Sequence, residues 1–155
     1  MRFYLVDRIE EICYGEYATG VKSISLADNI FNEHFPGIPV FPGSLILEGT
    51  AQLAGSFLEL TREHSGLPMR RSVLAIVNRF KFRRPAYPGD RLLYTVNLKA
   101  LREEYAVVSV KANIEQELCA EGELTFSLVD VQEERLHEAR TELYRIWMRK
   151  AKVKP

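Results

Sequence analysis

Residues 44–63 read SLILEGTAQLAGSFLELTRE, a run that is dominated by apolar side chains. These side chains occur at too many positions to form a single stripe along a helix. A helix that is apolar on nearly all sides is one that lies inside a protein. The run therefore predicts a buried central helix from Ser44 to about Glu63.

Strand-like runs lie on both sides of this helix. Before it, a short strand or turn is expected at residues 9–14, and alternating side chains predict a strand at 17–25. After it, PAYPGD, LREE and EQE separate four long runs that predict an antiparallel meander, near residues 72–82, 91–101, 105–115 and 118–129. A curled sheet of about five or six strands around one apolar helix is an α+β architecture, the hotdog fold.

The composition is that of an ordinary globular domain. The 155 residues are 46% hydrophobic and 27% charged, with 21 basic and 21 acidic residues, so the formal net charge is zero. Residues 1–130 are expected to form one domain, with 131–155 as its extension. This balance is not typical of a nucleic-acid-binding domain, which usually carries a net positive charge.

No stretch reaches the roughly 18 apolar residues that a transmembrane helix needs. Asp7 and Arg8 interrupt the apolar N-terminal run before the core of a signal peptide can form, which predicts a cytoplasmic protein. The two cysteines, Cys13 and Cys119, fit neither a disulfide framework nor a zinc site and are expected to be reduced thiols.

Two titratable side chains stand out in HFPGIPVFPGSLILE, residues 34–48. His34 begins a loop rich in Pro and Gly, where it can act as a neutral base near pH 7. Glu48 lies one turn into the apolar helix, where lost hydration favours the protonated form of its carboxyl. The pair therefore predicts one base and one acid.

The start of the helix supplies a third group. Pro42, Gly43 and Ser44 open it, so the amides of Gly43 and its successors lack helical partners and can hold a developing oxyanion. A base, an acid and an oxyanion site together describe loss of water from a 3-hydroxyacyl thioester, which gives a 2-enoyl thioester. This chemistry needs no metal or redox cofactor, and none is expected.

The sequence resembles the beta-hydroxyacyl-acyl carrier protein dehydratases of bacterial fatty acid synthesis, the FabZ/FabA group of hotdog enzymes. The resemblance covers nearly all of residues 3–130 and rests on FYLVDRI, HFPGIPVFPGSLILE, AQLAG and RFKFRRPAYPGDRL. It implies that His34 and Glu48 are the catalytic pair, contributed by opposite protomers of a dimer, and that Gly43 is the amide donor. Glu at the acid position is similar to the FabZ branch, which dehydrates without isomerising.

The chain departs from the family pattern at several positions. Glu33 stands where Gly usually precedes the catalytic His, and it either places a second carboxylate near His34 or points to solvent. Ser44 replaces an apolar residue or Cys, and Gly49-Thr50 replaces a small apolar pair. These changes bear on substrate length and rate. The extension after Val129 is also an addition, and it points to a specialised relative, such as one that serves a secondary lipid or polyene pathway.

Further residues are expected around the site. Gln52, one turn after Glu48, either orients the Glu48 carboxyl or has a structural role. Phe35 and Phe41 are expected to pack in the core and along the substrate tunnel. Between Arg70 and Arg91, seven basic residues stand against one acid. Within this segment, Lys81, Arg83 and Arg84 are expected to bind the acidic carrier protein and its pantetheine phosphate, the alternative being a solvated strand edge.

The extension predicts an amphipathic helix over about residues 132–150. Its apolar side is expected to pack on the domain or across a dimer. Its basic residues also permit contact with an anionic membrane, which is the less favoured role. The apolar side comprises Leu136, Ala139, Leu143, Ile146 and Trp147.

The protein is expected to be a homodimer or a larger assembly, such as a trimer of dimers, because a monomer would lack half of the catalytic pair. Two other functions remain open. One is a hotdog thioesterase, which would release a free thiol. The other is a non-catalytic hotdog subunit that binds acyl carrier protein.

Overall fold

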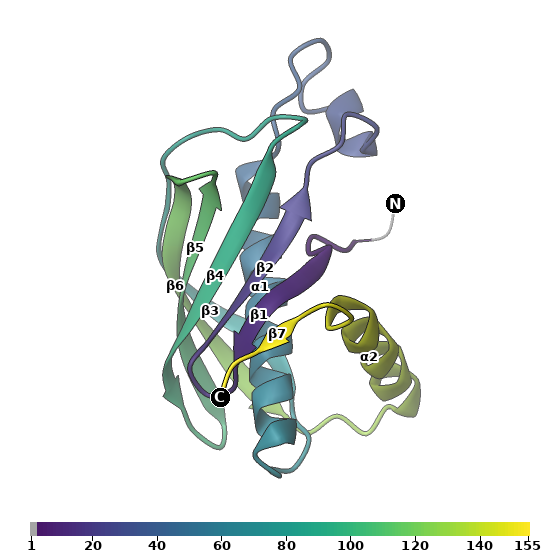
Figure 1. Cartoon of the computed structure of the whole chain (residues 1–155), viewed down its shortest axis with the longest axis vertical. Helices are drawn as coiled ribbons and strands as arrows, with labels where there is room; N and C mark the ends of the chain where they lie inside the picture. The colour runs from purple at the N-terminus through teal and green to yellow at the C-terminus, as the bar shows by residue number, and fades with distance from the viewer. Residues whose placement is uncertain (1–2) are drawn as a thin grey trace.

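A computed structural model describes residues 3–155, in which one curled sheet wraps around a long helix and a second helix packs outside (Figure 1). The sheet has seven strands in the order β3-β6-β5-β4-β2-β1-β7. The predicted α+β hotdog architecture is confirmed. In chain order the elements are β1 (Arg8–Cys13), β2 (Tyr17–Ser23), the 3-10 helix η1 (Asn29–Asn32), α1 (Gly43–His64), β3 (Arg71–Phe82), β4 (Arg91–Leu101), β5 (Tyr105–Ile114), β6 (Glu117–Val129), α2 (Glu134–Trp147) and β7 (Lys152–Val153).

The predicted strand positions are confirmed to within a few residues, but the predicted four-strand meander is wrong. β4, β5 and β6 form an antiparallel meander, whereas β3 pairs with β6 instead of β4. The reason is that β2 pairs along the other side of β4, so β4 has no edge left for β3. β3 therefore lies at one edge of the sheet. β7, which was not predicted, lies at the other.

The central helix is held close to the sheet by side chains that point inward from both. Leu53 and Phe57 of α1 and Tyr94 of β4 are fully buried. A Cβ atom at Gly49 would lie 2.2 Å from the Tyr94 hydroxyl oxygen, so this approach requires glycine. Burial raises the pKa of Tyr94. Glu48 precedes Gly49 in the helix, so the close contact between Gly49 and Tyr94 also positions the Glu48 backbone relative to the sheet.

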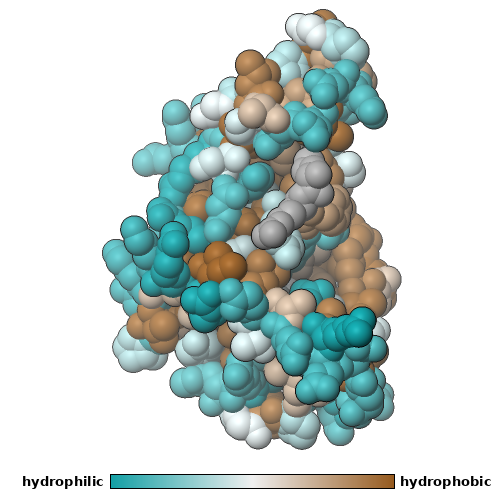
Figure 2. Space-filling view, turned by 90° about the vertical axis from the view of Figure 1, so that its right-hand side faces the viewer, coloured by the Kyte–Doolittle hydropathy of each residue, from teal (hydrophilic) through white to brown (hydrophobic). Residues whose placement is uncertain are grey.

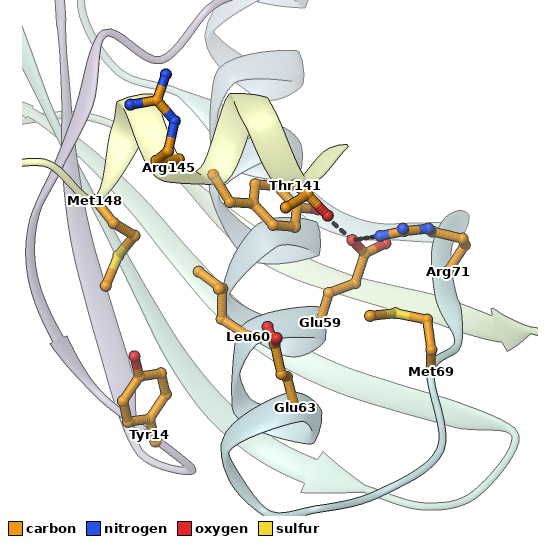
Figure 3. A pocket seen from close by; sticks show the side chains of 10 residues that line it. Tyr14, Glu59, Leu60, Glu63, Met69, Arg71, Thr141, Arg145 and Met148 are labelled. Atoms are coloured by element: carbon orange, nitrogen blue, oxygen red, sulfur yellow. Dashed lines mark hydrogen bonds and ion pairs between the residues drawn. The ribbon is translucent and has the colours of Figure 1, made fainter. Parts of the chain in front are cut away.

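Helix α2 is anchored to α1 and β3 by a buried polar cluster (Figure 3). Arg71 donates from Nη1 to Glu59 Oε2 at 2.7 Å, and the Tyr144 hydroxyl donates to the same oxygen. Arg71 also donates from Nε to His137 Nδ1 at 3.2 Å. His137 Nδ1 can accept because its Nε2–H donates to the Val131 carbonyl at 2.7 Å. Burial raises the pKa of Tyr144.

The apolar side predicted for α2 is confirmed in part. Leu143 and Trp147 pack against the core, but Ala139 and Ile146, expected on the same side, are exposed. Tyr144, which was not expected there, is buried instead. The Tyr144 hydroxyl donates to Glu59, which accounts for the burial of this polar side chain.

Candidate active site

His34 begins a tight loop, which backbone hydrogen bonds within residues 34–40 close. Phe35 and Ile38 exchange backbone hydrogen bonds of 3.0 and 2.9 Å, and the Val40 amide donates to the His34 carbonyl at 3.0 Å. The His34 ring is joined to the same residue by Nδ1, which lies 2.7 Å from the Val40 carbonyl oxygen. A carbonyl can only accept, so Nδ1 carries the proton and the neutral imidazole has a free lone pair on Nε2. His34 is thus oriented as a base.

The amides at the start of α1 are free of acceptors in the described part of the chain. Leu45 and Ile46 donate to the Pro42 carbonyl at 3.0 and 3.2 Å, which leaves the N–H groups of Gly43 and Ser44 without a partner. The Phe82 ring packs against Gly43, where a Cβ atom would lie 2.9 Å from it. The helix start can therefore hold an oxyanion.

Glu48 is half-buried, and its carboxylate accepts a hydrogen bond of 3.1 Å from Gln52 Nε2. The same amide nitrogen donates to the Phe3 carbonyl at 3.0 Å, and the Leu5 amide donates to Gln52 Oε1 at 2.9 Å. Gln52 therefore contacts Glu48 and also ties the N-terminal segment to α1. The two roles considered for Gln52 are compatible.

Phe35 and Phe41 were expected to pack in the core and along the substrate tunnel, and the core placement is confirmed for Phe41 only. Phe41 is buried and packs against Phe31, with 6.4 Å between ring centroids. The expected core packing of Phe35 is wrong: Phe35 lies on the exposed loop after His34, and its ring stacks on the His34 ring with 4.2 Å between centroids. Glu33 is exposed, and its carboxylate forms no hydrogen bond or ion pair with His34 within residues 3–155. Of its two expected placements, Glu33 adopts the solvent-facing one.

The basic segment is much less positive than its sequence indicates, because carboxylates from other elements face it. Arg83 pairs with Glu121 at 3.0 Å, and Arg84 pairs with Glu117. Lys81 is exposed and forms no ion pair within the described chain. These pairings could not be found from the sequence because the acids are more than thirty residues away along the chain.

A second basic cluster was not predicted as a unit. Arg8, Arg91, Arg149 and Lys150 line a hollow of about 350 Å³ together with Asp7. Arg8 and Arg91 both pair with Glu10, at 2.9 and 2.6 Å. These four basic residues come from three separate stretches of sequence, and only Arg91 belongs to the predicted basic segment.

The remaining predictions concern cysteines, metals and membranes. Cys13 and Cys119 are buried and form no disulfide within residues 3–155, and burial raises the pKa of the Cys119 thiol. Across residues 3–155, no group of three or more His, Cys, Asp or Glu side chains could hold a metal ion. Neither helix in that range has the length and apolar character needed to cross a membrane.

Comparison with known structures places the fold among hotdog proteins. The dehydratase heterocomplex ApeI:P from Xenorhabdus doucetiae matches with a TM-score of 0.68 at 16% identity, covering 88% of this chain and 90% of that one. A hot-dog-like protein from Thermanaerovibrio acidaminovorans matches with a TM-score of 0.60 at 23% identity, covering 91% and 93%.

Comparison of sequences gives the family. The 3-hydroxyacyl-[acyl-carrier-protein] dehydratase FabZ of Clostridioides difficile is 36% identical over 128 residues, which are 83% of this chain and 88% of that protein. The FabZ of Campylobacter concisus is 36% identical over 131 residues, with the same coverage. The model of the FabA-like domain matches residues 1–123, and the chain therefore belongs to the FabA-like family.

Proposed function

We propose that this chain dehydrates 3-hydroxyacyl thioesters carried on acyl carrier protein, with His34 as the base and Glu48 as the acid. His34 Nε2 takes the proton from carbon 2, while the Gly43 amide stabilises the negative charge on the thioester oxygen. Glu48 gives its proton to the hydroxyl on carbon 3 as the carbon–oxygen bond breaks. Water leaves, and a double bond forms between carbons 2 and 3. The proton on His34 then returns to the Glu48 carboxylate, by way of solvent, before the next turnover.

The observation that carries this proposal is the hydrogen bond from His34 Nδ1 to the Val40 carbonyl, in a chain of the FabA-like family. It leaves Nε2 free to accept a proton, which the reaction requires. The FabZ names of the relatives support the substrate class.

The product distinguishes this function from its rivals. Purified protein incubated with a 3-hydroxyacyl carrier protein is expected to lower the mass of the acyl group by one water and to leave the thioester intact. Absorbance from the new enoyl group should rise in parallel. Release of a free thiol would instead identify a thioesterase. Binding of the acylated carrier without any change in mass would identify a non-catalytic subunit.

The pair is proposed to come from opposite protomers of a dimer that joins through β3. Three apolar residues of this edge strand, Val73, Ile76 and Val77, have exposed fractions of 50%, 56% and 44%. Exposed apolar edge strands are sites of pairing with another chain. In the view of Figure 2, hydrophobic residues gather along the right-hand flank of the molecule. Phe35 and Ile38 of the His34 loop are exposed too and would be covered by the partner.

The carrier protein is proposed to dock at the end of β3, on Lys81, Arg83 and Arg84. This position lies next to the start of α1, because Phe82 packs against Gly43. Among the three cations, Lys81 has no carboxylate partner in the described chain and is free to meet an acidic surface.

Lys81→Glu is expected to raise KM for the carrier-bound substrate by about three- to tenfold at low salt, because it replaces attraction by repulsion. The difference should shrink in high salt. Steady-state kinetics with the same acyl group on pantetheine alone should give equal KM values for variant and wild type. Arg149→Glu, in the second basic cluster, is the matched control. If that variant raised KM and Lys81→Glu did not, the docking site would lie at the second cluster instead.

A further inference from the structure

A hollow of about 270 Å³ opens beside the Glu48 carboxylate. Glu48 and Gln52 of α1 line it, together with Phe3 and Tyr4 of the N-terminal segment. The hydrogen bonds of Gln52 to this segment and to Glu48 connect these lining residues. The hollow is therefore built around the group that we propose as the catalytic acid.

The other lining residues come from α2. They are Ala139, Arg140, Leu143 and Trp147, and Tyr4 packs edge-on against Trp147 with 6.3 Å between ring centroids. All four α2 residues lie beyond residue 123, where the match to the FabA-like domain ends. Arg140 does not make this lining unsuitable for an apolar ligand, because arginine can lay its methylene stem along apolar surface. The C-terminal extension thus adds a largely apolar lining that the matched domain lacks.

The chemistry of the reaction indicates what this hollow receives. If Glu48 protonates the hydroxyl on carbon 3, as the proposed function requires, then carbon 3 lies against its carboxyl. The acyl chain from carbon 4 onward must then extend away from the Glu48 carboxyl. We infer that the acyl chain enters the hollow, and that α2 sets the length of the apolar acyl chain that the enzyme accepts. Trp147 and Leu143 contact the acyl chain, and the α2 residues limit how far it extends.

Ala139→Phe tests the inference, because Ala139 is exposed on α2 and a larger side chain there enters the hollow with little cost to the helix. Relative to wild type, kcat/KM for 3-hydroxydecanoyl carrier protein should fall about tenfold or more, since each excluded methylene matters in an apolar pocket. For 3-hydroxybutyryl carrier protein, kcat/KM should stay within about twofold. Glu138→Phe is the matched control, since Glu138 is exposed on the same helix but does not line the hollow. It should leave both values unchanged.

A binding measurement keeps the test independent of catalysis. Trp147 is the only tryptophan of the chain and lines the hollow, so its fluorescence reports occupancy. Titration with decanoyl-pantetheine should give a saturable change in Trp147 fluorescence in wild type and in Glu138→Phe. In Ala139→Phe, the apparent affinity for decanoyl-pantetheine should be at least about tenfold weaker. Equal responses in all three proteins, or an equal fall in kcat/KM at both chain lengths, would overturn the inference. Saturable binding that Ala139→Phe weakens, in a protein with no turnover of either substrate, would support the hollow and refute the proposed function.

Discussion

His34→Ala is expected to lower turnover of 3-hydroxyacyl carrier protein by about a hundredfold or more, and Glu48→Ala to do the same, because each removes a positioned proton-transfer group. Mass measurement of water loss gives the rates. Glu48→Gln is the sharper variant of the acid, since it keeps the size of the side chain and an oxygen that can accept from Gln52. Rates close to wild type in the alanine variants would contradict the assignment of the catalytic pair.

Mixing the two inactive variants tests whether the pair spans two protomers. In an equal mixture that exchanges subunits, half of the dimers contain one protomer of each kind. Each mixed dimer has one site with both His34 and Glu48 intact and one site with neither. Activity should therefore return to about a quarter of the wild-type value. If each site lay within a single chain, the mixture would stay as inactive as its components.

The parts of the site that were predictable from the sequence are those encoded close together along it. His34, Gly43 and Glu48 lie within fifteen residues, and proline, glycine and apolar spacing indicate a loop followed by a buried helix. The contact of Gln52 with Glu48 was among the predicted possibilities, because the two residues lie one helical turn apart. The contact of Gln52 with Phe3 was not predictable, because 49 positions separate them. Pairing of Arg83 with Glu121 was hidden for the same reason.

The fold divides in the same way. Strand positions could be predicted because side-chain alternation and turn residues are local signals. The pairing of β3 with β6 could not, because it depends on β2 having already taken the edge of β4. The buried side of α2 was predicted only in part. Leu143 and Trp147 pack against the core as expected, but Tyr144, whose hydroxyl donates to Glu59, was not expected there.

That contact belongs to the cluster for which the largest stability effect is expected. Glu59→Ala should lower the free energy of unfolding by about 3–5 kcal/mol, because it leaves Arg71 buried without its counter-charge. The exposed fractions of the Arg71 and Glu59 side chains are 6% and 2%, so water cannot replace the lost partner. The Tyr144 hydroxyl would lose its acceptor as well. Urea unfolding at one fixed protomer concentration measures the change, since an oligomer's apparent stability depends on concentration.

Glu121→Ala provides the matched comparison, because Glu121 pairs with an arginine at a similar distance but at the surface. The Arg83 and Glu121 side chains are 47% and 33% exposed, and their 3.0 Å pair lies in contact with solvent. Its loss should cost at most about 1 kcal/mol, since exposed ion pairs are weak. Replacing both buried partners, as in Glu59→Leu with Arg71→Met, should recover much of the stability that Glu59→Ala alone removes, because no unpaired charge then stays buried. Equal urea midpoints for Glu59→Ala and Glu121→Ala would mean that the buried cluster does not anchor α2, and that Trp147 and its apolar neighbours do so instead.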